Sequence, residues 1–141
     1  MTPVSQSAPG SFSFPVRVYY EDTDTAGIVY YAGYLRFMER GRTEWLRALG
    51  VEQLQLAQKA GIVFAVRSLN IEYLKPARLD DLLAVVTELT LAGRAQITLS
   101  QRIERAGETL VEASVRIACL DARKMKPAAL PEEIRRKMGA P

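Results

Sequence analysis

Apolar positions first repeat with a helical period, over residues 31–49. Charged residues such as Arg36, Glu39 and Arg40 occupy intervening positions. The apolar stripe comprises Tyr34, Leu35, Met38, Gly41, Trp45, Leu46 and Leu49. Residues three and four apart share one face of a helix, so the pattern predicts a long amphipathic helix that ends near Gly50. A shorter helical piece follows and ends at Gly61.

The rest of the chain has the β-branched and alternating character that is typical of strands. One run precedes the helix at residues 14–20, and four follow it at 62–78, 82–92, 95–107 and 108–121. Short turns between the later runs favour antiparallel pairing, and we expect these four strands to form a meander. The basic C-terminal segment is predicted to close with a short helix after Pro131.

This order of elements predicts an α+β fold, in which a curved antiparallel sheet of five strands wraps around one long central helix. Residues 14–141 are expected to form this single domain, and the polar residues 1–13 a flexible tail. Strands at the edges of a sheet leave backbone groups unpaired. We therefore expect a homo-oligomer that continues the sheet.

Composition narrows the chemistry. The 141 residues include no histidine and one cysteine, which argues against a zinc site, and the net charge is +3. Cys119 lies in an alternating apolar run, so it is expected to be a buried strand residue. We find no secretory signal and no apolar run long enough to span a membrane, which predicts a cytoplasmic protein. The small positive charge fits an anionic small ligand and gives no support for nucleic-acid binding.

The segment EDTDTAGIVYYAGY, residues 21–34, places two carboxylates just before the predicted helix. The N–H groups of a first helical turn can polarise a carbonyl oxygen. A carboxylate such as Asp24 could then activate water or attack that carbonyl, and Gly27 would allow a sharp turn. These parts suit hydrolysis of an activated acyl group such as a thioester. Asp and Thr are also ordinary capping and turn residues, which is the interpretation we adopt for Asp22.

The longer segment RVYYEDTDTAGIVYYAGYLRFMERGRTEWLR, residues 17–47, resembles the signature of hotdog-fold acyl-CoA thioesterases. The likeness is to the 4-hydroxybenzoyl-CoA thioesterase superfamily, and in particular to its YbgC-like, Tol-Pal-associated branch. It continues through VEQLQLAQKAGIVFAVRSLNIEYLKPARLDDLLAVVTELT and ends with RKMKPAALPEEI, so it covers nearly all of the chain after the tail. The resemblance implies the hotdog fold, edge-to-edge dimers that can pair into tetramers, and active sites at the dimer interface.

The resemblance also implies roles for single residues. The catalytic aspartate of the family falls on Asp24, as general base or nucleophile, and the loop glycine falls on Gly27. A site tyrosine falls on Tyr20, for which strand packing is the alternative. Where the branch usually has histidine this chain has Tyr31, whose backbone N–H would polarise the thioester carbonyl. That donor survives a change of side chain.

The implied activity is that of an acyl-CoA thioester hydrolase of lipid metabolism, a homodimer or homotetramer. Coenzyme A would be part of the substrate, with no metal and no separate cofactor. Candidate cations for its phosphates are Arg67, Lys75, Arg78, Arg94, Lys124 and Lys126. Acyl carrier protein is the alternative acyl carrier. Because Tyr31 replaces histidine, a non-catalytic protein that binds acyl-CoA or acyl carrier protein is the second function class. A hotdog dehydratase would need a catalytic histidine.

Overall fold

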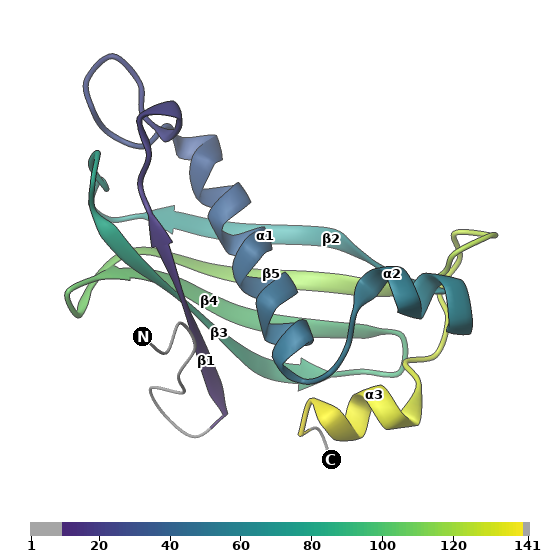
Figure 1. Cartoon of the computed structure of the whole chain (residues 1–141). Coiled ribbons are helices and arrows are strands. Elements are labelled where there is room, and N and C mark those ends of the chain that lie inside the picture. The colour runs from purple at the N-terminus through teal and green to yellow at the C-terminus, as the bar shows by residue number, and fades with distance from the viewer. Residues whose placement is uncertain (1–9, 140–141) are drawn as a thin grey trace.

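One long helix crosses the inner face of a curved, five-stranded antiparallel sheet (Figure 1). The computed structural model describes residues 10–139. In chain order the elements are β1 (Ser11–Arg17), α1 (Tyr31–Ala48), α2 (Gln53–Gln55), β2 (Ile62–Tyr73), β3 (Leu82–Ala92), β4 (Gln96–Arg105), β5 (Glu108–Asp121) and α3 (Glu132–Lys137). None of the helices between residues 10 and 139 combines the length and the hydropathy that a membrane span needs.

Most predicted elements are confirmed, but the limits of β1 and β2 differ from those predicted. β1 begins at Ser11, so residues 11–13 belong to the sheet and not to the expected tail; residues 1–9 lie outside the described residues. β2 ends at Tyr73 and not near residue 78. The extended character of 74–78 comes from Pro76, which favours extended backbone at the residue before it and cannot donate to a ladder.

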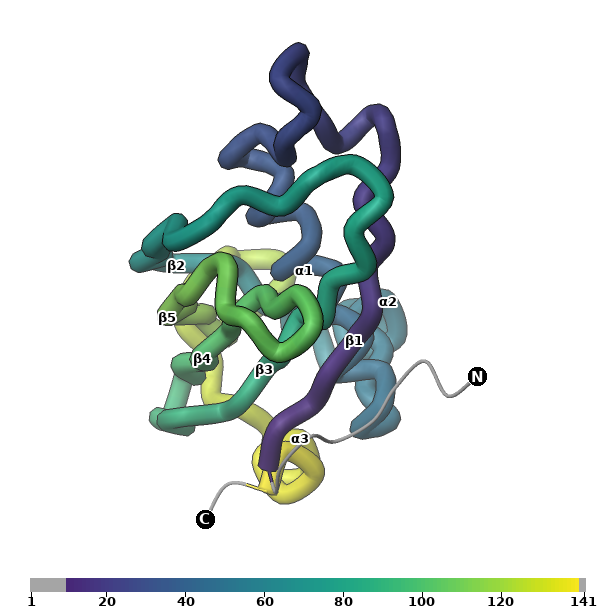
Figure 2. The backbone as a smooth tube through the Cα atoms, turned by 90° about the vertical axis from the view of Figure 1, so that its left-hand side faces the viewer, coloured from purple at the N-terminus to yellow at the C-terminus, as the bar shows by residue number. Residues whose placement is uncertain are grey.

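The expected meander of four strands is wrong for β2. The strand order is β1-β3-β4-β5-β2, so β2 pairs with β5 at one edge and lies three strands from β3. The eight residues 74–81 join β2 to β3, and an extended segment of this length reaches roughly 26–29 Å. Three strand spacings are about 14 Å, so the connection can cross the end of the sheet. Figure 2 shows this connection, in teal, arching from β2 towards β3.

The apolar stripe of α1 packs on the sheet, but the buried face includes Phe37 and leaves out the predicted Leu35. Phe37 and Met38 are fully buried, and Trp45 and Leu46 nearly so. Leu35, expected in the stripe, is 38% exposed. It lies one turn after the exposed Tyr31, on the side of α1 that the sheet does not cover.

Gly41 lies where α1 comes closest to β3. A Cβ atom built at Gly41 would lie 2.5 Å from Cγ1 of Val85, which is fully buried on β3. A real side chain could not occupy that space without moving helix or strand. Close backbone packing therefore explains a glycine in mid-helix, where it costs about 1 kcal/mol relative to alanine.

We expect Gly41→Ala to destabilise the protein by about 1–3 kcal/mol, because the overlap with Val85 outweighs the better helix propensity of alanine. Urea denaturation measures the change in the free energy of unfolding. The double variant Gly41→Ala, Val85→Ala should lose less unfolding free energy than the two single variants lose together, because Val85→Ala removes the clashing methyl group. A Gly41→Ala protein as stable as the wild type would contradict this account.

Cys119 is a core residue, as predicted. It lies on β5, is 1% exposed and forms no disulfide. Burial raises the pKa of its thiol, which keeps it protonated and unreactive at neutral pH.

Candidate active site

Asp24 lies between β1 and α1, at the start of a tight turn. Its Oδ1 accepts a hydrogen bond of 2.8 Å from the Ala26 N–H, and its carbonyl oxygen accepts one of 3.0 Å from the Gly27 N–H. Gly27 has φ +77°, a left-handed conformation in which a side chain would be strained. The sharp turn expected at Gly27 is confirmed, and the Asp24 carboxylate is exposed at its start.

Asp22 shapes the base of the same segment. It is only 7% exposed, and its Oδ2 accepts a hydrogen bond of 2.8 Å from the Tyr19 N–H. Its Oδ1 lies 3.7 Å from the guanidinium of Arg36 on α1. Its carbonyl oxygen also accepts a hydrogen bond from the Tyr30 N–H. These contacts confirm the loop-shaping interpretation of Asp22.

The N-terminus of α1 carries no side-chain cap. Tyr31 is the first helical residue, and Tyr30 at the N-cap position makes no side-chain hydrogen bond to the helix. The first N–H groups of a helix have no intrahelical acceptor and carry a partial positive charge. The Tyr31 N–H is therefore a donor suited to a ligand oxygen.

Asp24 and Tyr31 line one cleft of about 440 Å³. Its other walls come from residues 28–30, from Tyr34 on α1, and from residues 73–76, at and just beyond the end of β2. The volume is within the range of small-molecule sites, roughly 300–1,000 Å³. The structure thus brings the predicted carboxylate and the predicted helix N-terminus to one cleft.

Tyrosine rings form much of its wall. The Tyr31 ring lies edge-on to that of Tyr73 at 6.4 Å, and the Tyr73 hydroxyl donates a hydrogen bond to the Tyr31 carbonyl oxygen. Burial raises the pKa of both Tyr73 and Tyr34, so their hydroxyls stay neutral at pH 7. Sequence reasoning did not place Tyr34 or Tyr73 in the site. The spacing of three residues between Tyr31 and Tyr34 was the available signal for Tyr34, because it puts both on one helix face.

Tyr20 is not among the residues that line this cleft. It lies in a 3₁₀ turn, Tyr20–Asp22, beyond the end of β1, and is 83% exposed. The expectation that it ends the first strand is wrong, because β1 stops at Arg17.

The expected phosphate-binding cations divide into two groups. Lys75 lines the cleft and forms an ion pair with Glu108. The backbone of Arg78 forms an isolated antiparallel β-bridge with Ile28, which lies in the wall of the cleft. Arg67 lies at a bulge in the middle of β2 and donates a hydrogen bond to Gln96. Lys126 lies near the start of β2. Its carbonyl oxygen accepts a hydrogen bond from the Asp121 N–H, and Asp121 pairs with Ile62, the first residue of β2. Of these four candidates, Lys75 lines the cleft together with Asp24, and Arg78 is a backbone neighbour of Ile28 in its wall.

A second cavity lies farther along the same helix. It measures about 150 Å³ and has an apolar floor that includes Phe64, Leu99 and Ile117. Arg42 lies at its wall, and burial lowers the pKa of that guanidinium. None of its lining residues is shared with the Asp24 cleft. This apolar cavity beside α1 is therefore separate from the Asp24 cleft.

The sequence matches the Thioesterase-like superfamily over residues 18–138. It is 50% identical to the acyl-CoA thioesterase YbgC of Haemophilus influenzae, over 88% of this chain and 91% of that protein. It is 48% identical to the acyl-CoA thioester hydrolase YbgC of Escherichia coli O6:H1, over 87% of this chain and 92% of that protein.

The fold has the same relatives. The crystal structure of a probable thioesterase from Bartonella henselae is similar with a TM-score of 0.80 and 39% identity, over 84% of this chain and 98% of that one. The long helix on a five-stranded antiparallel sheet confirms the expected hotdog fold. The chain therefore belongs to the thioesterase-like superfamily of hotdog-fold proteins.

Proposed function

We propose that the protein hydrolyses the thioester of an acyl-CoA, with Asp24 and the Tyr31 N–H acting on the thioester carbonyl. The observation that carries this proposal is the single cleft lined by both Asp24 and the uncapped start of α1. The substrate class is supported by the YbgC relatives, which are named acyl-CoA thioesterase or thioester hydrolase.

The chemistry needs a donor at the carbonyl oxygen and a base or nucleophile near the carbonyl carbon. As general base, Asp24 takes a proton from water while the water oxygen attacks that carbon. The Tyr31 N–H stabilises the negative charge on the carbonyl oxygen. The C–S bond then breaks, and the departing thiolate takes the proton from Asp24. As nucleophile, Asp24 instead attacks that carbon and displaces the CoA thiolate, which leaves an anhydride. Water then opens the anhydride to the free acid and the Asp24 carboxylate, and the proton that water gives up neutralises the thiolate. Neither route requires a metal or a separate cofactor.

We assign Lys75 and Arg78 to the CoA phosphates bound beside the Asp24 of the same protomer. Lys75 would exchange Glu108 for a phosphate when the substrate binds. Lys126, near the start of β2, would serve the cleft of a neighbouring copy, and Arg67, in the middle of the strand, would lie between the two clefts. Antiparallel pairing of two β2 edges places the first residues of one strand beside the last residues of the other.

A homodimer through β2 is part of this proposal. β2 is an edge strand, yet its side chains Val66, Leu69 and Tyr73 are 50%, 36% and 45% exposed. An edge that offers both unpaired backbone groups and apolar side chains favours pairing with a second chain.

We expect Leu69→Lys to convert the dimer to a monomer, because it places a charge at an interface that buries apolar side chains. Light scattering coupled to size-exclusion chromatography measures the molar mass, and it also separates a dimer from a tetramer. Leu91→Lys is the matched control, since Leu91 is 60% exposed near the end of β3 and away from the β2 edge. A Leu69→Lys protein with the mass of the wild type would refute pairing through β2.

Thiol release from a panel of acyl-CoAs, from short aliphatic to long-chain and aromatic, tests the activity. Hydrolysis of one or more members is the expected result, and their order ranks the acyl pocket. The same acyl groups on acyl carrier protein test the alternative carrier. Tight binding of acyl-CoA without any turnover would instead indicate a binding protein.

A further inference from the structure

The segment that carries Asp24, residues 24–29, is hydrogen-bonded to the connection between β2 and β3, residues 74–81. The Val29 N–H donates a hydrogen bond of 2.9 Å to the Ala77 carbonyl oxygen, and the Leu79 N–H donates one of 3.3 Å to that of Gly27. Figure 2 shows the dark-blue segment above the teal connection, in agreement with these contacts. A shift of residues 77–79 would therefore carry the Asp24 turn with it.

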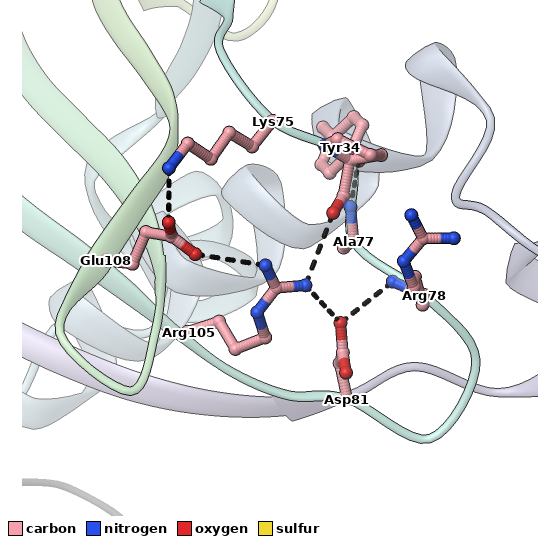
Figure 3. Close-up of polar contacts among 8 residues, drawn as sticks. Tyr34, Lys75, Ala77, Arg78, Asp81, Arg105 and Glu108 are labelled. Carbon is pink, nitrogen blue, oxygen red and sulfur yellow. Dashed lines mark hydrogen bonds and ion pairs between the residues drawn. The ribbon is translucent and has the colours of Figure 1, made fainter.

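Different groups hold the ends and the middle of this connection. Backbone hydrogen bonds to Leu110 and Val18 fix its two ends. In the middle, the Tyr34 hydroxyl accepts a hydrogen bond of 2.9 Å from the Ala77 N–H. Near its two ends, Glu108 pairs with Lys75, and Arg17 donates a hydrogen bond of 2.8 Å to the Asp80 carbonyl oxygen. Arg105, at the end of β4, contacts residues on both sides of Ala77 (Figure 3).

Arg105 binds three acceptors at once. Its Nη1 donates to Asp81 Oδ2 at 2.8 Å and to the Pro76 carbonyl oxygen at 3.3 Å, and its Nη2 donates to Glu108 Oε1 at 3.0 Å. Asp81 Oδ2 also accepts a hydrogen bond of 2.8 Å from the Arg78 N–H. One guanidinium thus ties both sides of the connection to the β4–β5 turn.

The two carboxylates that Arg105 binds, those of Asp81 and Glu108, are stabilised in their charged form. Burial alone would raise the pKa of Asp81, but the hydrogen bonds from Arg105 and from the Arg78 N–H bring it below its usual range. Hydrogen bonds from Lys75 and Arg105 lower the pKa of Glu108. Both carboxylates are therefore ionised at neutral pH. Planar guanidinium groups hold several such acceptors with a geometry that a lysine ammonium cannot reproduce.

We propose that Arg105 is a positioning residue that fixes the Asp24 turn through the connection 74–81. The inference rests on the proposed hydrolase function for its effect on turnover, but its structural part stands independently. Arg105 touches the connection and not the cleft, since it is absent from the residues that line the cleft. Its contribution is the placement of the Asp24 carboxylate relative to the Tyr31 N–H, and errors of about 1 Å in such placement can cost 100-fold in rate.

The test compares Arg105→Ala, Arg105→Lys and the control Arg102→Ala. Arg102 lies on the same strand, but its ion-pair partner is Glu104 and not a residue of the connection. We expect Arg105→Ala to lower kcat about tenfold or more, with a smaller change in KM, because the reacting groups are displaced while the walls of the cleft remain. Arg105→Lys should recover part of kcat, and Arg102→Ala should match the wild type.

Nuclear magnetic resonance supplies the readout that does not depend on activity. The Ala26 amide reports on the Asp24 carboxylate, and the Val29 amide on the contact with the connection. We expect Arg105→Ala to shift the Ala26 resonance and to speed hydrogen exchange at Val29, with neither effect in Arg102→Ala. Unchanged Ala26 and Val29 amides in Arg105→Ala would overturn the proposal, and so would equal losses in Arg102→Ala. A wild-type protein without acyl-CoA turnover would refute the proposed function alone, since the amides still decide the role of Arg105.

Discussion

Replacement of Asp24 by asparagine is expected to lower kcat for acyl-CoA hydrolysis by about 1,000-fold or more. A positioned general base contributes roughly 100- to 10,000-fold, and a lost nucleophile costs at least as much. The turn should survive, because an asparagine oxygen can still accept the hydrogen bond from the Ala26 N–H. Steady-state thiol release measures kcat, and circular dichroism and light scattering check that fold and assembly are unchanged.

A folded Asp24→Asn protein that keeps most of its turnover would rule out both roles for this carboxylate. Single turnover in ¹⁸O-labelled water then divides the two roles in the wild type. A general base leaves the label only in the product acid. Label recovered in the Asp24 carboxylate would establish an anhydride intermediate opened at the aspartate, and hence the nucleophile.

Tyr31→Pro is expected to lower kcat by about 100- to 1,000-fold, because it removes the proposed N–H donor to the carbonyl oxygen. Proline is well tolerated at the first position of a helix. The preceding Tyr30 already has φ −64° and ψ 141°, an extended conformation that suits a residue before proline. The substitution therefore removes one hydrogen-bond donor while α1 keeps its start.

Two further substitutions separate the backbone from the side chain. Tyr31→Phe should keep most of the turnover, and a large loss would give the hydroxyl a role. Tyr31→Ala removes the ring that packs on Tyr73 but keeps the N–H, so its kcat should exceed that of Tyr31→Pro by at least about tenfold. Equal losses in Tyr31→Ala and Tyr31→Pro would show that the ring, and not the N–H, matters.

Local patterns predicted most elements because their causes are local. The limits of β3 and β5 agree with their alternating runs, and α1 begins at Tyr31 as its period predicted. Gly41 also fitted its position, since its place on the buried stripe already suggested a close approach. The misplaced Leu35 has a different origin: periodicity shows which residues share a face, but not how far the sheet extends beneath it.

The predicted strand order was wrong for β2 because the pairing of a strand, like the extent of a buried face, is not a local property. Short connections favour pairing between neighbouring strands, but pairing in a curved sheet depends on the whole set of strands and on the helix that they enclose. The connection 74–81 is long enough to cross the end of the sheet, and nothing local opposes that path.

The sequence by itself determined the elements, the buried Cys119, the turn at Gly27 and the proximity of Asp24 to a helix start, because each follows from neighbours along the chain. It also carried the family resemblance through residues 17–47. Only the tertiary structure decided that Tyr34, Tyr73 and Lys75 share the cleft of Asp24, that Tyr20 does not line it, and that Arg105 contacts the adjoining connection from another strand. Arg105 lies 81 positions from Asp24 in sequence numbering, and such long-range contacts exist only after the strands have paired and closed around the helix.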